Sequence, residues 1–404
     1  MSFEIPRQSI SRRQLLARSL AAAGVTVCIP LLPSWAALPK TAERSSRLAK
    51  FGPLGSPDAN GLRLPPGFRS RIVARSGKRP VADRDFIWHG APDGGATFAV
   101  NDGGWIYASN AELAGNAGGA SALRFDASGE LIDAYRILGN TNVNCAGGPT
   151  PWGTWLSCEE HPEGLVWECD PLGKVPARSW PALGAFTHEA VAIDPTTMQA
   201  YLTEDLPDGR WYRFSADRRD ARTGAPDLSS GKLEAAEWDG VPGGRVQWHV
   251  IEDASGRSVP TRLQVPRTTA FRGGEGCWYA RGTVFFTTKH DNRVWAFDIA
   301  KQSLRILYDA ARVADPVLFG VDNVTTTAAG DVLVAEDGGD MQIVALSGND
   351  LTPIVQVEGH RQSEVTGPAF DPSGTRLYFS SQRGAGGRSG DGVTYEVSGP
   401  FTTA

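Results

Sequence analysis

The residues best suited to chemistry in this sequence are carboxylates at the ends of short apolar runs. Three runs are followed directly by acidic pairs: Glu159-Glu160, Glu204-Asp205 and Glu336-Asp337. Other polar candidates stand at the starts or ends of further runs: Asn110, Glu112, Glu189, Glu275, Lys289, Asp322, Asn323, Glu364 and Gln382. Carboxylates that a fold gathers repel one another, and burying them without partners is costly. A bound cation removes this conflict, and oxygen ligands favour a hard ion such as Ca²⁺.

Cys145 adds a different kind of donor. A thiolate in the same ring of ligands would favour a transition metal over calcium. Taken singly, a cysteine is more often a buried apolar side chain, and a single strand-end carboxylate is more often solvated. The metal-site prediction therefore depends on the collective pattern.

Short strands in a repeated order must position these groups. A strand, a turn of Asp, Pro or Gly, and a second strand with a polar end recur in residues 189–205, 322–337 and 367–382. The mature sequence shows no convincing amphipathic helix. Strand repeats of about 40–60 residues are typical of propeller blades, because one small sheet cannot bury its faces until neighbours stack around a ring.

We therefore predict an all-β fold, a β-propeller with six blades. The number six comes from strand-ending sites near residues 109, 158, 203, 288, 335 and 380. Matching strand ends of a propeller converge on one face of its central channel, so distant carboxylates become neighbours. A β-sandwich with long insertions is the alternative, because the repeat is irregular between residues 205 and 270.

The N-terminus has the pattern of an export signal. Arg12 and Arg13 precede an apolar stretch from Leu15 to Ala37, and small residues fit a cleavage site after Ala36, which is typical of a twin-arginine signal. We predict a signal peptide over 1–36, an extended lead-in over 37–65 and a single propeller domain over 66–404. A membrane anchor is the alternative, but prolines interrupt the apolar stretch.

Charge and motifs narrow the function further. Four Arg and one Glu leave with residues 1–36, so the formal net charge changes from −5 to −8 and no basic stripe remains, which argues against a nucleic-acid partner. Zinc-finger spacings and the Gly-x-Ser-x-Gly elbow of serine hydrolases are absent. Spacing alone leaves a disulfide between Cys158 and Cys169 open.

Several phrases together resemble the PhoX family of alkaline phosphatases. The most distinctive is Asn144-Cys-Ala-Gly-Gly-Pro-Thr-Pro-Trp-Gly-Thr-Trp-Leu-Ser-Cys-Glu-Glu160. The others are His188-Glu189, Leu202-Thr-Glu-Asp205, Glu336-Asp-Gly338 and Glu364-Val-Thr-Gly-Pro-Ala-Phe370. The resemblance extends from about residue 100 to 382 and agrees with the export signal.

The resemblance implies a six-bladed propeller that hydrolyses small phosphate esters in the periplasm with Fe³⁺ and Ca²⁺. It implies Cys145 as the thiolate ligand of iron and a set of metal carboxylates: Glu159, Glu160, Glu189, Glu275, Asp322, Glu336 and Glu364. We expect a monomeric protein, periplasmic or extracellular, whose partner during export is the twin-arginine translocase.

The sequence departs from the family at a position that matters for catalysis. Family phosphatases have an Arg two residues before the glutamate that matches Glu275, where it would bind substrate phosphate, and this chain has Gly273. Arg272 and Lys289 are the candidates to replace it. The departure leaves two alternatives to a phosphatase: a calcium-dependent, lactonase-like hydrolase and a non-catalytic metal-binding propeller.

Overall fold

The computed structural model describes residues 48, 51–348 and 350–401. The predicted signal peptide, with Arg12 and Arg13, lies outside the described residues. So do residues 37–47 and 49–50 of the predicted lead-in. Residues Met1–Leu38 and Pro39–Ala404 are separate units, and the description below concerns the second. Within the described ranges, no helix has the length and apolar character needed to cross a membrane.

Strands make up nearly all regular structure in the described part of the chain, which confirms the all-β prediction. The helical elements labelled there are single 3-10 turns: η3 (Pro181–Leu183), η4 (Thr261–Leu263), η5 (Lys289–Asp291), η6 (Ala310–Arg312) and η7 (Ser389–Asp391).

The strands form five hydrogen-bonded sheets. Two four-stranded sheets come first: β3 (Pro92–Ala99), β4 (Trp105–Ala111), β5 (Gly118–Phe125) and β6 (Leu131–Thr141), then β7 (Asn144–Pro149), β8 (Trp155–Glu159), β9 (Val166–Cys169) and β10 (Arg178–Ser179). A nine-stranded sheet follows: β11 (His188–Ile193), β12 (Ala200–Glu204), β13 (Trp211–Ala216), β14 (Gly231–Trp238), β15 (Gly244–Val250), β16 (Gly274–Ala280), β17 (Thr283–Thr288), β18 (Arg293–Asp298) and β19 (Ser303–Asp309).

The last two sheets include strands from the start of the described chain. One contains β20 (Val321–Thr326), β21 (Val332–Glu336), β22 (Gln342–Ser347), β23 (Asp350–Val357) and β1 (Leu62–Arg63). The other contains β24 (Val365–Phe370), β25 (Arg376–Ser381), β26 (Val393–Ser398) and β2 (Arg69–Arg75).

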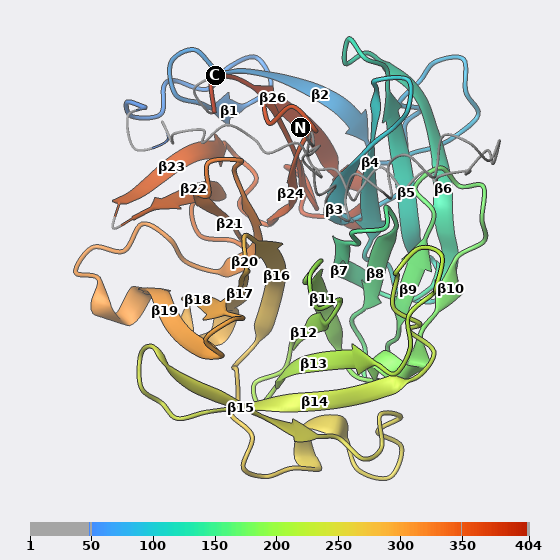
Figure 1. Ribbon diagram of the computed structural model, residues 1–404. Coiled ribbons are helices and arrows are strands. Elements are labelled where there is room, and N and C mark those ends of the chain that lie inside the picture. Colours follow the sequence, from blue (N-terminus) through green and yellow to red (C-terminus); the bar gives the residue numbers. More distant parts are fainter. Residues whose placement is uncertain (1–47, 49–50, 349, 402–404) are drawn as a thin grey trace, which may run out of the picture. The chain divides into compact units, whose positions relative to one another are not determined.

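The first strands of the repeats contact one another in a closed ring. β3, β7, β11, β16, β20 and β24 contact each other in chain order, and β24 contacts β3. Figure 1 shows these strands nearest the middle of the ring. The ring confirms the propeller and replaces the sandwich alternative. Counted by inner strands the blades number six, and the nine-stranded sheet is two blades joined where β15 pairs with β19.

This joining explains the irregular sequence between residues 205 and 270. β14 and β15 form a long hairpin, and Gly244 and Arg245 at the start of β15 pair with β19 of the next blade. Residues 251–273 then form a loop that contains η4 before the next inner strand begins. The repeat is thus interrupted by an outer hairpin and its loop.

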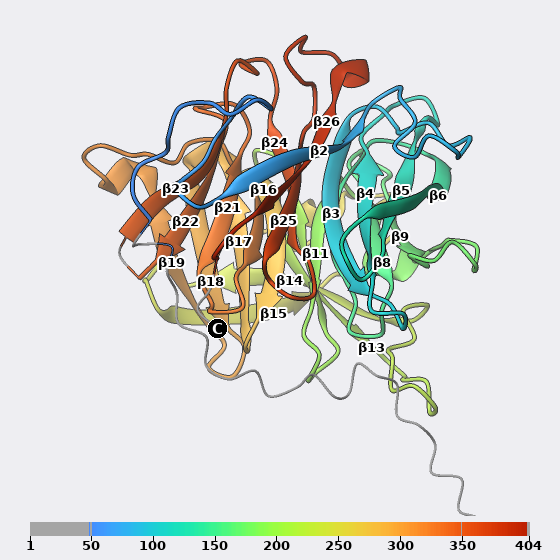
Figure 2. The same ribbon diagram turned by 90° about the horizontal axis from the view of Figure 1, so that it is seen from above.

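The N-terminal strands tie the ring shut. β2 pairs with β26 as the outer strand of the last blade, beside which it lies in Figure 2. β1 pairs with β23 of the preceding blade, so the end of the predicted lead-in adds a strand to the propeller. Arg71 strengthens the closure because its Nη2 lies 2.7 Å from the buried Glu396 Oε2. The two ends of the propeller are thus held together by backbone pairing.

Every inner strand has the same irregularity near its start. In each of the six, two residues of the inner strand oppose one residue of the second strand, so the pairing register shifts by one residue: at 93–94, 145–146, 189–190, 275–276, 322–323 and 367–368. A bulge of this kind redirects side chains that regular pleating would send to the faces of the sheet. The six bulges lie at equivalent places, so they can aim side chains at one common centre.

Small residues let the inner strands approach one another below these bulges. A Cβ added at Gly148 would lie 1.7 Å from the carbonyl oxygen of Val191 in the next blade. A Cβ at Gly276 would lie 2.6 Å from the backbone nitrogen of Val324, and one at Gly367 2.6 Å from the oxygen of Asp93. Glycine at these three positions is required by backbone proximity across blade boundaries.

We predict that Gly148→Ala lowers stability by about 3 kcal/mol, because the methyl group must push β7 and β11 apart. The measurement is the thermal unfolding midpoint of purified protein. Gly390→Ala is the control, since a Cβ there has no heavy atom within 4 Å. Equal midpoints for the two variants would contradict the close-packed ring.

Candidate metal centre

The bulges supply a first set of side chains to one end of the ring. The first bulged residues of five blades are Asp93, Cys145, Glu189, Glu275 and Asp322. All five are buried, with at most 9% of their surface exposed. The sixth bulge begins with Gly367, and Glu364 reaches the centre from just before β24. Five sequence-distant positions thus converge because the blades are equivalent.

A second set follows the ends of the second strands. The residues directly after β4, β8, β12, β17, β21 and β25 are Glu112, Glu160, Asp205, Lys289, Asp337 and Gln382. The first member of each acidic pair belongs to the strand and points elsewhere, as alternation along an extended chain requires. The second member is therefore the one that reaches the central groups.

Four groups of donors have ligand atoms within 4.8 Å of one another. They are Cys145–Glu160–Glu189, Asp93–Glu112–Glu364, Glu189–Glu275–Asp322 and Asp322–Asp337–Glu364. Glu189, Asp322 and Glu364 each belong to two groups. The groups therefore form one continuous cluster of eight carboxylates and one thiol, which we call the central cluster.

The contacts of Cys145 and Glu189 test whether the cluster fits a metal. The thiol donates to Glu189 Oε1 at 3.3 Å and to Asp93 Oδ2 at 3.6 Å. Glu189 is fully buried, and its Oε2 has no hydrogen-bond partner among the described residues. A buried carboxylate oxygen without a partner is costly. A cation bound by this oxygen and the deprotonated thiol would satisfy both, so the donor set fits.

Burial and mutual repulsion oppose ionisation of the cluster. Burial, followed by neighbouring carboxylates, raises the pKa of Asp93, Glu189 and Cys145 well above the ordinary values. The same two causes raise the pKa of Glu160 to about 8. Such a concentration of perturbed groups is typical of a functional site.

Two cationic side chains partly compensate this charge. Lys289 Nζ lies 2.7 Å from Glu275 Oε1, 3.3 Å from Asp337 Oδ2 and 4.0 Å from Asp205 Oδ2. Burial acts to lower the pKa of Lys289, but the carboxylates around it, Glu275 first, raise it well above its ordinary value. Lys289 therefore remains an ammonium ion beside the central cluster.

Arg383 is the second cation. Its Nη2 lies 2.9 Å from Glu364 Oε1, and its Nη1 donates to Gln382 Oε1. The side chain is 33% exposed, so part of the guanidinium faces solvent. Lys289 contacts Asp337 and Arg383 contacts Glu364, so both cations border the Asp322–Asp337–Glu364 group.

Six of the predicted metal residues lie in the central cluster: Cys145, Glu160, Glu189, Glu275, Asp322 and Glu364. Glu159 and Glu336 do not. The carboxylate of Glu159 accepts bonds from the backbone N–H groups of Asn142 and Leu165 and from Trp167 Nε1. Glu336 likewise accepts from the N–H groups of Phe319 and Gln342. These two carboxylates hold loops in place.

The two candidates to replace the family arginine, Arg272 and Lys289, lie in different environments. The side chain of Arg272 is exposed and has no ion pair among the described residues, whereas Lys289 contacts the cluster. Gly273 has a φ of 66°, and a Cβ there would meet the ring of His290 at 2.9 Å. Its backbone conformation and this contact both disfavour a larger residue at 273.

Sequence reasoning missed Asp93 and Arg383, and it listed Glu112 and Asp337 among the strand-end candidates without predicting them as metal ligands. Asp93 lies in Pro92-Asp-Gly-Gly-Ala96, before a strand that resembles the other inner strands only weakly. In several inner strands an acidic residue stands two positions before regular strand pairing begins. A search for this recurrence could have identified Asp93. The other cysteines in the described ranges, Cys158, Cys169 and Cys277, are buried free thiols.

Comparison with known protein families shows to which family the chain belongs. The family model for alkaline phosphatase PhoX matches residues 104–168 and 161–384. The chain belongs to the PhoX alkaline phosphatase family. This confirms the resemblance, and with the central cluster it identifies a metal-dependent phosphatase, a phosphoric ester hydrolase. No curated protein sequence matches the chain.

Two solved structures are similar to this PhoX family member, and the first shares its fold. Pseudomonas fluorescens PhoX in complex with vanadate, a transition state analogue, has a TM-score of 0.72 at 15% identity, covering 86% of this chain and 97% of that one. A gluconolactonase, XC5397 from Xanthomonas campestris, has a TM-score of 0.47 at 12% identity, covering 87% of this chain and 98% of that one.

The adjacent residues Glu159 and Glu160 give a matched test of the site. We predict that Glu160→Gln lowers metal content per chain, because it weakens the Cys145–Glu160–Glu189 group. Glu159→Gln should retain the metal but lose about 2 kcal/mol of stability, because an amide cannot replace the charge-assisted bonds that hold the loop. Elemental analysis and thermal unfolding of both variants measure this. Equal metal loss in both would contradict the assignment.

Proposed function

We propose that this protein is an exported phosphatase that hydrolyses small phosphate esters with iron and calcium held in the central cluster. The observation that carries the proposal is the thiol of Cys145 within a ring of buried carboxylates at equivalent bulges. A site for calcium alone has no need of a thiolate, whereas Fe³⁺ accepts both sulfur and oxygen ligands.

The donor groups suggest how two kinds of ion would be distributed. Cys145, Glu160 and Glu189 combine sulfur and oxygen and suit Fe³⁺. The Asp93–Glu112–Glu364 and Asp322–Asp337–Glu364 groups offer oxygen alone and suit Ca²⁺. Glu275 and Asp322 join the two parts through Glu189. When bound, these ions would stabilise the negative charge that develops on the phosphoryl oxygens.

The side chains of Lys289 and Arg383 are proposed to bind the phosphoryl group. Both cations border the Asp322–Asp337–Glu364 group. A guanidinium with free donors matches phosphate oxygens well, and an ammonium ion adds a point charge. Arg383 thereby supplies, from another blade, the guanidinium that the family has at the position of Gly273. In this proposal, Arg272 has no part in binding the phosphoryl group.

Export completes the proposal. The twin-arginine signal with Arg12 and Arg13 would deliver the folded protein to the periplasm or the exterior, with the twin-arginine translocase as its partner. Because this pathway carries folded proteins, metal ions can be inserted before export. In the periplasm or the exterior the protein acts as a monomer.

The first test is metal content and turnover of protein purified after native export. We expect iron and calcium in each chain and hydrolysis of para-nitrophenyl phosphate. Cys145→Ala should lose iron and at least a hundredfold of turnover, roughly the effect of losing one strong electrostatic stabiliser. Calcium without iron, together with no turnover, would refute the phosphatase and leave a lactonase-like enzyme or a binding propeller.

The role of Arg383 is tested separately. We predict that Arg383→Gln raises KM for para-nitrophenyl phosphate and the inhibition constant of inorganic phosphate by about tenfold, because a charge-assisted contact to the phosphoryl group is lost. Metal content should stay unchanged. Arg388→Gln is the control and should match the wild type, because Arg388 is an exposed arginine of the same loop whose side chain pairs with Asp391. Unchanged phosphate inhibition in Arg383→Gln would refute the assignment.

A further inference from the structure

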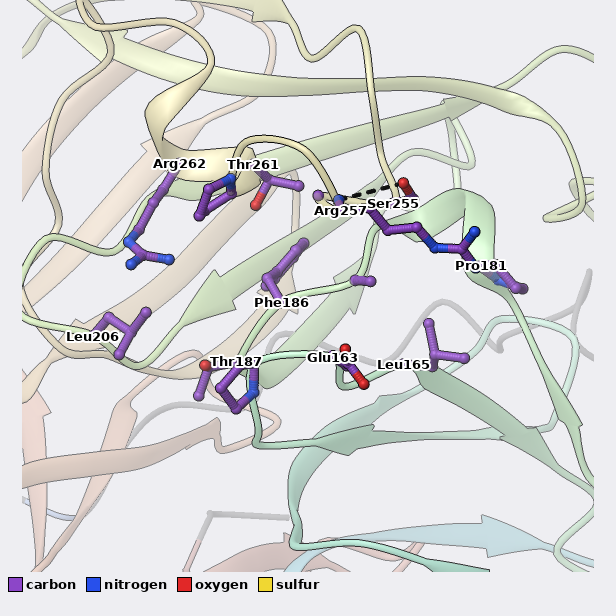
Figure 3. Close-up of a pocket in the computed structure, with 14 residues that line it drawn as sticks. Glu163, Leu165, Pro181, Phe186, Thr187, Leu206, Ser255, Arg257, Thr261 and Arg262 are labelled. Atoms are coloured by element: carbon purple, nitrogen blue, oxygen red, sulfur yellow. Dashed lines mark hydrogen bonds between the residues drawn. The ribbon is translucent and has the colours of Figure 1, made fainter.

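A cavity of about 660 Å³ is lined by residues of the second and third blades (Figure 3). Four segments line it: the turn at Pro162–Leu165, the stretch from Pro181 to Thr187, Leu206, and the loop from Ser255 to Arg262. A volume of this size is within the range of pockets that bind small organic molecules.

The inner end of the cavity is fixed to the metal-binding residues by the backbone. Thr187 forms a β-bridge with Glu160 and accepts a hydrogen bond from the N–H of Asp205 at 3.2 Å. Thr187 is also two residues from Glu189, and Leu206 follows Asp205. Backbone contacts therefore join the wall of the cavity to the residues that carry or adjoin the Cys145–Glu160–Glu189 group.

Seven of the fourteen residues that line the cavity are apolar, and they include an aromatic ring held in a fixed orientation. Leu165, Leu206 and Pro260 face the cavity with Phe186. The ring of Phe186 packs 3.6 Å from that of His188 and 4.4 Å from that of Tyr212, measured between centroids. A rigid aromatic and aliphatic surface favours a flat or bulky apolar group over a small polyol.

The charged residues of the lining do not change this preference. Arg262 lies 3.0 Å from Asp208 and 3.6 Å from Glu204, so its charge is compensated. Glu163 and Arg257 are exposed and carry opposite charges at the rim. The pocket thus offers no concentrated charge for a second phosphate or carboxylate group.

We infer that this pocket binds the organic group of the phosphate ester and selects esters of aryl or other bulky apolar alcohols. The inference rests on the proposed function. Hydrolysis breaks the bond between phosphorus and the ester oxygen. Water supplies a hydroxyl group to phosphorus and a proton to the departing oxygen, so the organic group leaves as a neutral phenol or alcohol. Apolar walls suit this product as well as the substrate.

The test compares 1-naphthyl phosphate with glycerol 2-phosphate on the metal-loaded protein. The wild type should show a kcat/KM at least about tenfold higher for the naphthyl ester, a difference that a few buried methylene-sized groups can supply. Ser255→Trp places an indole in the cavity from an exposed position. It should raise KM for the naphthyl ester about tenfold, change that for glycerol 2-phosphate less than twofold and leave the metal content unchanged.

Ser258→Trp is the matched control, because Ser258 is exposed on the same loop and does not line the cavity. Ala185→Leu, a smaller change from the Pro181–Thr187 segment, gives the answer if Ser255→Trp does not fold. Turnover by the wild type without preference, or equal KM changes for both esters in the pocket variants, would overturn the inference alone. Absence of turnover of either ester by iron- and calcium-loaded wild type would overturn the proposed function itself.

Discussion

Mutual repulsion among buried carboxylates is the constraint on which the rest of this structure depends. Eight carboxylates and a thiol lie in one cluster, and the side-chain cations in contact with it are Lys289 and Arg383 within the described residues. Left unpaired, such a cluster would favour opening of the ring. The backbone resists that opening through six inner strands in close contact and through the pairing of β2 with β26. A cation bound among these carboxylates is attracted by each of them, so the charges that repel one another also favour metal binding.

The acidic pairs show how the sequence divides two tasks between neighbouring residues. In Glu159-Glu160 and Glu336-Asp337, the first carboxylate accepts backbone N–H groups and the second reaches the centre. An extended chain sends consecutive side chains in opposite directions, so one pair can serve both tasks. The loop is fixed by the residue next to the ligand, and this limits the freedom of the ligand itself.

The sequence alone was sufficient for the propeller and for the end of the ring at which the site lies, because strand ends and turn residues recur visibly. It was not sufficient for the choice within each acidic pair. Glu159 and Glu336 were predicted as ligands, while Glu112 and Asp337 were named only as strand-end candidates, since periodicity does not say which member of a pair faces the axis. Asp93 was missed because its place depends on a bulge, and a one-residue register shift leaves no periodic signal. Arg383 was missed because its relation to Glu364 and to Gly273 exists only after the blades close into a ring.

The six blades are not identical at the site, and as a result its two sides differ chemically. The sulfur donor and its partners Glu160 and Glu189 belong to the second and third blades, on the side of the apolar cavity. Lys289 and Arg383 come from the fourth and sixth blades and border the Asp322–Asp337–Glu364 group. A phosphate ester is itself polar at one end and organic at the other. Binding with the phosphoryl group toward the two cations and the organic group toward Phe186 would satisfy both sides, whereas the reverse orientation would leave phosphoryl oxygens against apolar walls. Under this proposal, a ring of equivalent strands acquires a preferred substrate orientation through the few positions at which its blades differ.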